Sequence, residues 1–365
     1  LWHKLLIRNA DYARDAALCR VITEPVQQYL DQQTALIEFF IARGQLVVFI
    51  ATQDEIQAVR LKVQLTQIQQ LLQLVWLNLR SVPKSSVKQQ IHSARNMRGI
   101  LQKLYKLLMA PLETFLASYS NLIVVPHGPL HYLPFHALYI DDTPLLLQKE
   151  ISYLPSASFL RHCAEAKISG TECVVLGNSY KGQLPNAVAE ARNVAELLGS
   201  KALVEREATV AALQAAATNG RILHLATHGD FRADNPTFSG LAFADSWLTT
   251  LDIFSLRLQA SLVTLSACQT GRSVIGGGDE LLGLMRAFLS AGAASLVLSL
   301  WAVEDSSTAC FMQEFYSDLV RGKSKREALR NAQRLLLEVT SKEYPQYTHP
   351  YYWAPFYLVG NAGKL

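Results

Sequence analysis

The sequence has 365 residues, 50% of them hydrophobic, which is enough to form the core of one large domain or two ordinary ones. Lysine and arginine outnumber aspartate and glutamate by 34 to 30, and no single basic run concentrates this excess, so direct nucleic-acid binding is not expected. The longest apolar stretch, residues 291–303, is well short of the roughly 20 residues that a membrane span needs, so no membrane association is expected.

The chain begins with Leu1 and no secretory signal is recognisable, so we expect a fragment or a processed product. The cysteines are odd in number and widely scattered, without any CxxC pair. This pattern indicates a reducing compartment, and hence a cytoplasmic protein, rather than a disulfide framework or one of the usual zinc sites. The five are Cys19, Cys163, Cys173, Cys268 and Cys310.

The first third of the sequence predicts a hairpin followed by helices. Residues 1–34 have a polar, helical pattern and form a lead-in. Two apolar β-rich runs within residues 35–52 are joined across Ala42-Arg43-Gly44, which predicts a hairpin. In residues 53–118 leucine, glutamine and valine recur at spacings of three and four, which predicts two long helices. We assign residues 35–120 to one N-terminal part.

From residue 121 to residue 365 the pattern changes to short apolar runs alternating with helical segments. Fully apolar strands separated by helices predict a parallel sheet covered on both faces, an α/β layer sandwich. The predicted strands are 122–126, 173–178, 222–227, 262–267 and 295–300, and the clearest helices are 186–199 and 279–292.

Two reactive side chains directly follow two of these strands. His228 follows the strand 222–227, and Cys268 follows the strand 262–267. In such sheets the sites lie outside the carboxyl ends of the strands. If the two strands are neighbours, both side chains emerge at the same edge of the sheet, as a Cys–His pair requires.

The chemistry of a Cys268–His228 pair would be nucleophilic. A thiol attacks as thiolate, and a neighbouring base or positive charge lowers its pKa from about 8.5. Peptide N–H groups at the turns after the strands can hold a developing oxyanion, and Gly229 leaves room for a substrate carbonyl. Alternatively, Cys268 could have the role of a small buried hydrophobic residue. Its position where the apolar run ends favours the role of a nucleophile.

Other histidines are interpreted as structural. His224 lies four residues before His228, a metal-ligand spacing on a helix, but it stands in an apolar strand without a carboxylate beside it, so we expect a core histidine with a hydrogen-bonded ring. His127, His131 and His136 lie among prolines and aromatics, which favours a packed loop over a metal site. The glycine-rich residues 276–283 lack the pattern of a phosphate-binding loop.

Further motifs follow one another in the second half of the sequence: LHLATHGDF, SLVTLSACQTG, GDELLGLMRAFLSAGAASLVLSLWAVED and YYWAPFYLVGN. In this order they resemble the CHAT family of caspase-like cysteine peptidases, which are related to separase and often fused to tetratricopeptide repeats. The resemblance continues upstream through LIVVPHGPLHYLPFHAL and ALIEFFIARGQLVVFIAT and covers about residues 30–362.

The resemblance implies a caspase-like three-layer sandwich with a mainly parallel central sheet, plus an N-terminal hairpin and a long helical insertion. It implies a cysteine endopeptidase that cleaves a protein or peptide substrate through a dyad of Cys268 and His228, with oxyanion donors at Gly229 and Cys268. No cofactor and no metal is implied. The dyad residues are 40 positions apart, near the roughly 50 of caspases, although the caspase Q-A-C-x-G signature is not met.

Regulation and specificity are also implied by the resemblance. The tetratricopeptide repeats that the resemblance leads us to expect are absent from the sequence, and residues 1–34 would be their only remnant. A regulatory partner is expected to act through a repeat region upstream of these residues. By similarity to separase, Glu304 or Asp305 would bind the basic side chain before the cleaved bond. The simpler interpretation is that both are acidic residues in the first turn of a helix over 304–320, stabilised by its dipole.

Two other classes of function compete with the peptidase. A catalytically silent caspase-like interaction domain would keep the fold and bind a partner. Retention of both His228 and Cys268 favours the enzyme. A nucleotide-binding α/β protein is disfavoured because no phosphate-binding motif is present.

Overall fold

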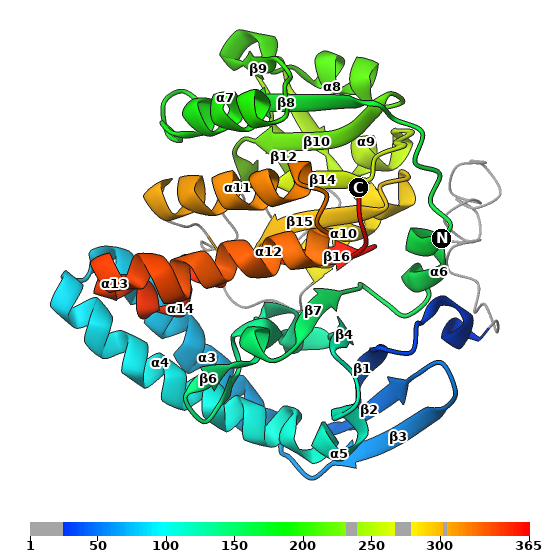
Figure 1. Ribbon diagram of the computed structural model, residues 1–365, viewed down its shortest axis with the longest axis vertical. Coiled ribbons are helices and arrows are strands. Elements are labelled where there is room, and N and C mark those ends of the chain that lie inside the picture. The colour runs from blue at the N-terminus through cyan, green and yellow to red at the C-terminus, as the bar shows by residue number, and fades with distance from the viewer. Residues whose placement is uncertain (1–24, 231–238, 267–278, 302–304) are drawn as a thin grey trace.

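A computed structural model describes residues 25–230, 239–266, 279–301 and 305–365 of the chain (Figure 1). A large sheet runs through the described residues, with strand order β3-β2-β1-β4-β7-β16-β15-β14-β10-β8-β9. Its strands are β1 (Thr34–Ala42), β2 (Gln45–Ala51), β3 (Ile56–Leu61), β4 (Asn121–Val125), β7 (Glu150–Tyr153), β8 (Glu172–Gly177), β9 (Ala202–Val204), β10 (Gly220–Ala226), β14 (Leu262–Leu265), β15 (Ser295–Ser299) and β16 (Phe356–Gly360).

Most neighbouring strands of this sheet run parallel. The antiparallel pairs are β1 with β2, β2 with β3, and β15 with β16. Every strand from β14 to β9 runs parallel to its neighbour. Parallel strands require crossover connections, and here most of these contain helices that cover the sheet. The prediction of a mainly parallel central sheet is therefore confirmed.

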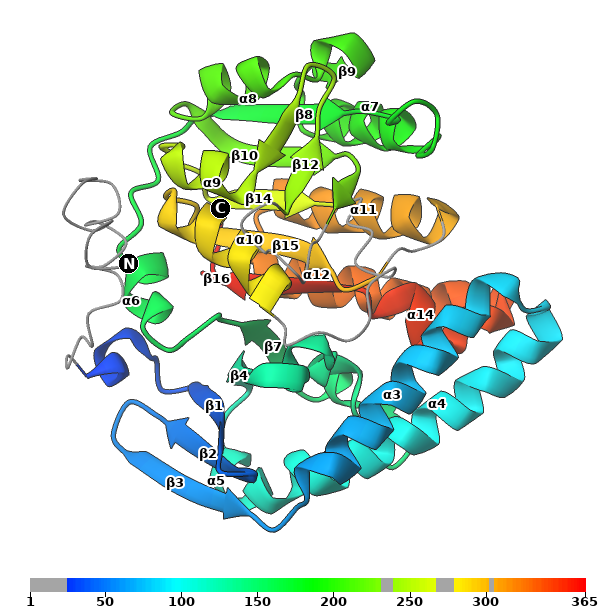
Figure 2. The same ribbon diagram turned by 180° about the vertical axis from the view of Figure 1, so that it is seen from behind.

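Helices form a layer on each face of the sheet. Figure 1 shows α7, α11 and α12 over one face, and Figure 2 shows α9 and α10 over the other. This is the three-layer α/β arrangement that the sequence predicts. The helices are α6 (Phe159–Ala164), α7 (Ala187–Leu197), α8 (Val210–Ala216), α9 (Thr250–Ser255), α10 (Asp279–Ser290), α11 (Asp305–Val320) and α12 (Lys325–Arg334), with the short α5 (Glu113–Leu116), α13 (Ser341–Glu343) and α14 (Pro350–Trp353).

The N-terminal hairpin is confirmed, but the segment after it differs from the prediction. β1 and β2 pair across Arg43-Gly44, both of which have positive φ. Residues 53–118 are not helical throughout, because β3 pairs with β2 along its whole length. Ile56 is 54% exposed, so β3 lacks the alternation of buried apolar and exposed polar residues that marks a strand. In residues 1–34, the described part contains only a short 3₁₀ turn, Val26–Tyr29, before β1.

The two long predicted helices are present as α3 (Leu65–Ser81) and α4 (Val87–Leu108). They pack side by side as an antiparallel pair along one edge of the molecule (Figure 2). Leu72 and Val75 of α3, and Met97 and Leu101 of α4, are buried, because apolar residues spaced by three and four lie on one face of a helix. Ser86 forms a capping box with Gln89 and so fixes the start of α4.

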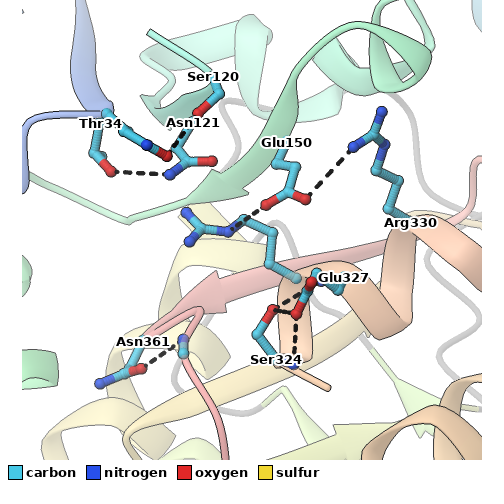
Figure 3. A network of polar contacts seen from close by, with 11 residues as sticks. Thr34, Ser120, Asn121, Glu150, Ser324, Glu327, Arg330 and Asn361 are labelled. Carbon is cyan, nitrogen blue, oxygen red and sulfur yellow. Dashed lines mark hydrogen bonds and ion pairs between the residues drawn. The ribbon is translucent and has the colours of Figure 1, made fainter.

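Polar contacts fasten α12 to the sheet. Glu150 of β7 forms ion pairs with Arg326, at 2.8 Å, and with Arg330, at 3.5 Å (Figure 3). Ser324 caps α12 through Glu327. All three residues of the ion-pair group are largely shielded from solvent, so screening by water is weaker than at an exposed pair. The group holds α12 across β7, beside β16.

No helix within the described parts of the chain is both long enough and apolar enough to cross a membrane.

Candidate active site

The strands that precede His228 and Cys268 in the sequence are neighbours in the sheet, which meets the condition that the sequence left open. β10 and β14 run parallel, with Leu225 opposite Leu265. The backbone N–H of Ser266 donates to the carbonyl of Leu225 at 3.3 Å, so the pairing continues to the end of β14. His228 is three residues beyond Leu225, and Cys268 is three residues beyond Leu265. Cys268 itself lies outside the described residues.

The imidazole of His228 is half-buried and surrounded by aromatic rings. The ring of Tyr180 stacks on it, with centroids 4.4 Å apart and planes 11° from parallel. Trp247 approaches both rings edge-on, at 5.9 Å from each. Such aromatic contacts stabilise by about 0.5–1.5 kcal/mol beyond the area they bury. The orientation of the His228 ring is therefore restricted by two neighbours from other segments.

Tyr180 comes from the loop after β8, and its backbone is strained. Tyr180 has φ 47°, Lys181 φ 58° and Gly182 φ 79°, so three successive residues adopt the left-handed region. For the two residues with side chains this costs about 1–2 kcal/mol each. Asn178 compensates part of the cost, because its side-chain oxygen accepts from the Tyr180 N–H at 3.0 Å.

Gly229 begins a small three-stranded sheet beside the main one, made of β11 (Gly229–Asp230), β12 (Gly240–Ala242) and β13 (Trp247–Thr249). The Ala242 N–H donates to the His228 carbonyl at 2.8 Å, so residues 228 and 242 form a hydrogen-bonded pair. Such pairs alternate in antiparallel strands, so the next pair, Gly229 and Leu241, is of the other kind. The Gly229 N–H therefore points away from β12.

His224 lies in the core and not at the site. It is fully buried in β10, and its Nδ1 lies 2.9 Å from the hydroxyl of Tyr316 on α11. The Tyr316 hydroxyl in turn donates to Thr264 of β14 at 2.8 Å. Nε2 of His224 lies 3.1 Å from a carboxylate oxygen of Glu190 on α7, close enough for an ion pair but not aligned for a hydrogen bond.

This contact network agrees with the interpretation of His224 as a core histidine with a hydrogen-bonded ring. The sequence shows no carboxylate beside His224, and the fold supplies one from α7, which packs over β10. Burial raises the pKa of Tyr316, so its hydroxyl stays neutral and able to donate. The network joins α7, β10, β14 and α11 behind the candidate site.

The other three histidines singled out by the sequence are packed rather than gathered around a metal. His127 accepts the Ile41 N–H on Nδ1 at 2.8 Å and stacks on Phe40. Burial lowers the pKa of His131 to about 3 and that of His136 to about 4, so both stay neutral. In the described part of the chain no three His, Cys, Asp or Glu residues come together as metal ligands would.

The remaining cysteines that the structure describes are unlike an activated nucleophile. Burial raises the pKa of Cys163 to about 12, and burial also raises the pKa values of Cys173 and Cys310. A raised pKa means that little thiolate is present at neutral pH. The raised pKa values therefore indicate that these three cysteines are structural.

One of the two candidate specificity residues, Asp305, is the first residue of α11. That helix begins at Asp305, so an acidic residue does occupy its first turn, where the helix dipole favours negative charge. Glu304 lies outside the described residues.

Sequence reasoning missed Tyr180 and Trp247. A signal existed for Tyr180, an aromatic residue just beyond the carboxyl end of a predicted strand. Using it requires the sheet order, because β8 must lie beside β10 for Tyr180 to reach His228. The sequence gives no comparable signal for Trp247, because β13, the strand that carries it, is only three residues long.

The layered sheet, with a histidine beyond one strand and a cysteine position beyond its neighbour, defines a caspase-like α/β protein. Residues 98–361 match the CHAT domain model. The chain therefore belongs to the CHAT domain family, whose fold is that of caspase-like cysteine peptidases.

Two tetratricopeptide repeat proteins are similar to this chain in sequence. Tetratricopeptide repeat protein 28 of Homo sapiens is 29% identical over 331 residues, covering 73% of this chain and 13% of the relative. The Mus musculus protein of the same name is 28% identical over 331 residues, with the same coverage. The chain thus spans about an eighth of the length of these relatives.

The solved structures of yeast separase show the same fold. Separase of Saccharomyces cerevisiae, in its complex with securin, superposes with a TM-score of 0.62 at 11% identity, covering 95% of this chain and 31% of the matched chain. The Arg-specific cysteine proteinase gingipain R has a TM-score of 0.47 at 10% identity, covering 73% of this chain and 68% of the proteinase.

Proposed function

We propose that the chain is a cysteine endopeptidase in which Cys268 attacks a peptide carbonyl and His228 acts as its base. The observation that carries the proposal is the register of β10 and β14, since His228 and Cys268 stand three residues beyond the paired residues Leu225 and Leu265. Parallel neighbouring strands in register end at one edge of the sheet, which supports the proposal that the two residues act together there.

The reaction would proceed in two steps. The thiolate of Cys268 bonds to the carbonyl carbon, and the imidazolium of His228 gives its proton to the leaving amine. Water, deprotonated by His228, then hydrolyses the thioester and releases the acid. The N–H of Gly229 points away from β12, which supports the proposal that Gly229 and Cys268 donate to the oxyanion.

Specificity and regulation belong to the same proposal. Glu304 or Asp305 would receive a basic side chain before the cleaved bond. The names of the curated relatives record tetratricopeptide repeats, which supports control of the peptidase by a partner that binds an upstream repeat region. The substrate would be a protein or peptide in the cytoplasm.

The alternative is a non-catalytic interaction domain, which the repeat-containing relatives also suit. A peptidyl acyloxymethyl ketone separates the two functions, since it alkylates an activated cysteine after binding as a peptide. We expect it to modify Cys268 in the parent chain, and much more slowly in His228→Ala. Equal modification of Cys268 in both chains would favour the interaction domain.

A further inference from the structure

We propose that Tyr180 is a positioning residue for His228, whose stacked ring holds the imidazole in the orientation that attack by Cys268 requires. The inference rests on the proposed function, in which His228 is the base. It assigns a part in the reaction to the loop after β8, which lies outside every motif discussed above.

The geometry of the stack limits how the imidazole can turn. A ring turns about its Cβ–Cγ bond by sweeping its edge through the space above and below its plane. The Tyr180 ring occupies that space on one side, nearly parallel at 4.4 Å between centroids. Trp247 stands edge-on to both rings at 5.9 Å. Together the two rings confine the imidazole to its observed plane.

The backbone of the loop points to the same role. Positive φ is common for glycine and tolerated by asparagine, but it is unfavourable for tyrosine. A loop that only connected β8 to α7 would be more stable with glycine or asparagine at position 180. Strain of this kind persists where the surroundings fix it, and it is concentrated at functional sites. Placement of the Tyr180 ring on His228 accounts for the strain.

Hydrogen bonds tie this loop to the frame that carries His228. Asn178 donates its backbone N–H to Ala226 at 2.9 Å and its side-chain amide to the carbonyl of Ala242 at 3.4 Å. The same Ala242 donates its N–H to the His228 carbonyl. The hydroxyl of Thr227 also donates to Ala242. Tyr180 and His228 are therefore held against one strand, β12, and keep their relative positions.

Precise orientation of a base is worth a large factor in rate. A misplacement of about 1 Å can slow a positioned reaction by about a hundredfold. Loss of the Tyr180 ring would leave His228 present but remove the restraint on one face of its imidazole. We therefore expect a loss of reactivity of about tenfold to a hundredfold, without loss of the fold.

Two substitutions separate positioning from loop structure. Tyr180→Asn removes the ring while providing a residue that accepts positive φ, so the loop should be as stable as in the parent or more so. Tyr180→Phe keeps the ring and removes only the hydroxyl. Tyr344, which is 45% exposed and remote from β8 in the chain, supplies the matched control Tyr344→Asn.

The readout is the rate at which iodoacetamide alkylates Cys268 at neutral pH, followed by mass spectrometry, with thermal melting as the check on folding. We expect Tyr180→Phe and Tyr344→Asn to react like the parent, and Tyr180→Asn to react about tenfold to a hundredfold more slowly at an equal or higher melting temperature. If Cys268 is alkylated as fast in Tyr180→Asn as in the parent, and slowly in His228→Ala, the positioning role of Tyr180 is wrong and the proposed function stands. Parent and His228→Ala reacting alike would overturn both.

A second readout does not depend on Cys268. The ring current of Tyr180 should shift the His228 ring protons upfield in the NMR spectrum of chain labelled at histidine. We expect this shift in the parent and in Tyr180→Phe, and its loss in Tyr180→Asn. A His228 signal that is unchanged in Tyr180→Asn would show that no stack exists in solution and would overturn the inference.

Discussion

His224 and Glu190 meet in the core, where Nε2 of the imidazole lies 3.1 Å from Oε1 of the carboxylate. The contact joins β10 to α7 just behind the segment that leads to His228. Since the His224 side chain is fully buried, its polar atoms depend on these partners and on Tyr316.

His224→Gln should therefore destabilise the protein rather than its chemistry. A partly unsatisfied buried polar group costs about 1–3 kcal/mol, and we expect the free energy of unfolding in urea to fall by that amount. His92→Gln, at an exposed position of α4, is the matched control and should change little. A folded His224→Gln chain that had lost all cysteine reactivity would mean that His224, not His228, is the base.

The buried histidine His136 should make stability depend on pH. Its Nε2 lies 3.0 Å from the Ala354 carbonyl and Nδ1 lies 3.0 Å from the Tyr153 hydroxyl, and burial lowers the pKa of His136 to about 4. In the unfolded chain His136 takes up a proton near pH 6.5, whereas in the folded chain it does so only near pH 4. The contribution of neutral His136 to the free energy of unfolding is thus fully present above pH 6.5 and falls as the pH drops below that value.

The measurement is the change in the free energy of unfolding between pH 7.5 and pH 5. His136 should account for about 2 kcal/mol of the loss. His136→Gln should be less stable than the parent at pH 7.5, yet its free energy of unfolding should fall less between pH 7.5 and pH 5. In His92→Gln the free energy of unfolding should fall as much as in the parent. An equal loss in the parent and in His136→Gln would contradict a neutral buried imidazole.

Much of the fold could be predicted because its strands are apolar on both faces. The apolar runs 222–227 and 262–267 contain β10 and β14, which are buried between two helical layers, so these strands can be recognised from their composition. β3 escaped prediction because it lies at the edge of the sheet, where exposed Ile56 and Ala58 break the expected pattern. Pairing with β2, not its own composition, makes it a strand.

The site could be predicted only in part for a related reason. His228 carries its own signal, a reactive side chain just after an apolar strand. The role of Tyr180 depends on the sheet order and on backbone angles that no residue pattern encodes. The contact of Glu190 with His224 could not be predicted from the sequence either, since only the packing of α7 on β10 brings the two residues together.

Substrate preference should reveal whether the start of α11 takes part in binding. A partly desolvated carboxylate gains most from a fully charged partner, so if Glu304 or Asp305 lines the pocket, peptides with Arg or Lys before the cut should be favoured. The preference should disappear in Glu304→Gln or in Asp305→Asn, whichever residue contacts the substrate. Cleavage profiles of a peptide library, compared among the three chains, measure this.

The helix-dipole interpretation of these residues gives the opposite result. Each substitution would then cost about 0.3–1 kcal/mol of stability and leave the cleavage profile unchanged. A parent without basic preference, or variants with the parent's profile, would remove Glu304 and Asp305 from the substrate pocket.

The most direct measurement is the appearance of new peptide ends when the folded chain is incubated with denatured proteins, counted by mass spectrometry. If Cys268 and His228 act as one dyad, the parent should generate new ends, and Cys268→Ala and His228→Ala should each reduce their rate by about a thousandfold or more, because either loss removes the covalent route. Both variants should melt near the temperature of the parent. New ends produced equally by the parent and Cys268→Ala, or none from a folded parent whose Cys268 reacts with the peptidyl ketone, would contradict the assignment of a cysteine peptidase.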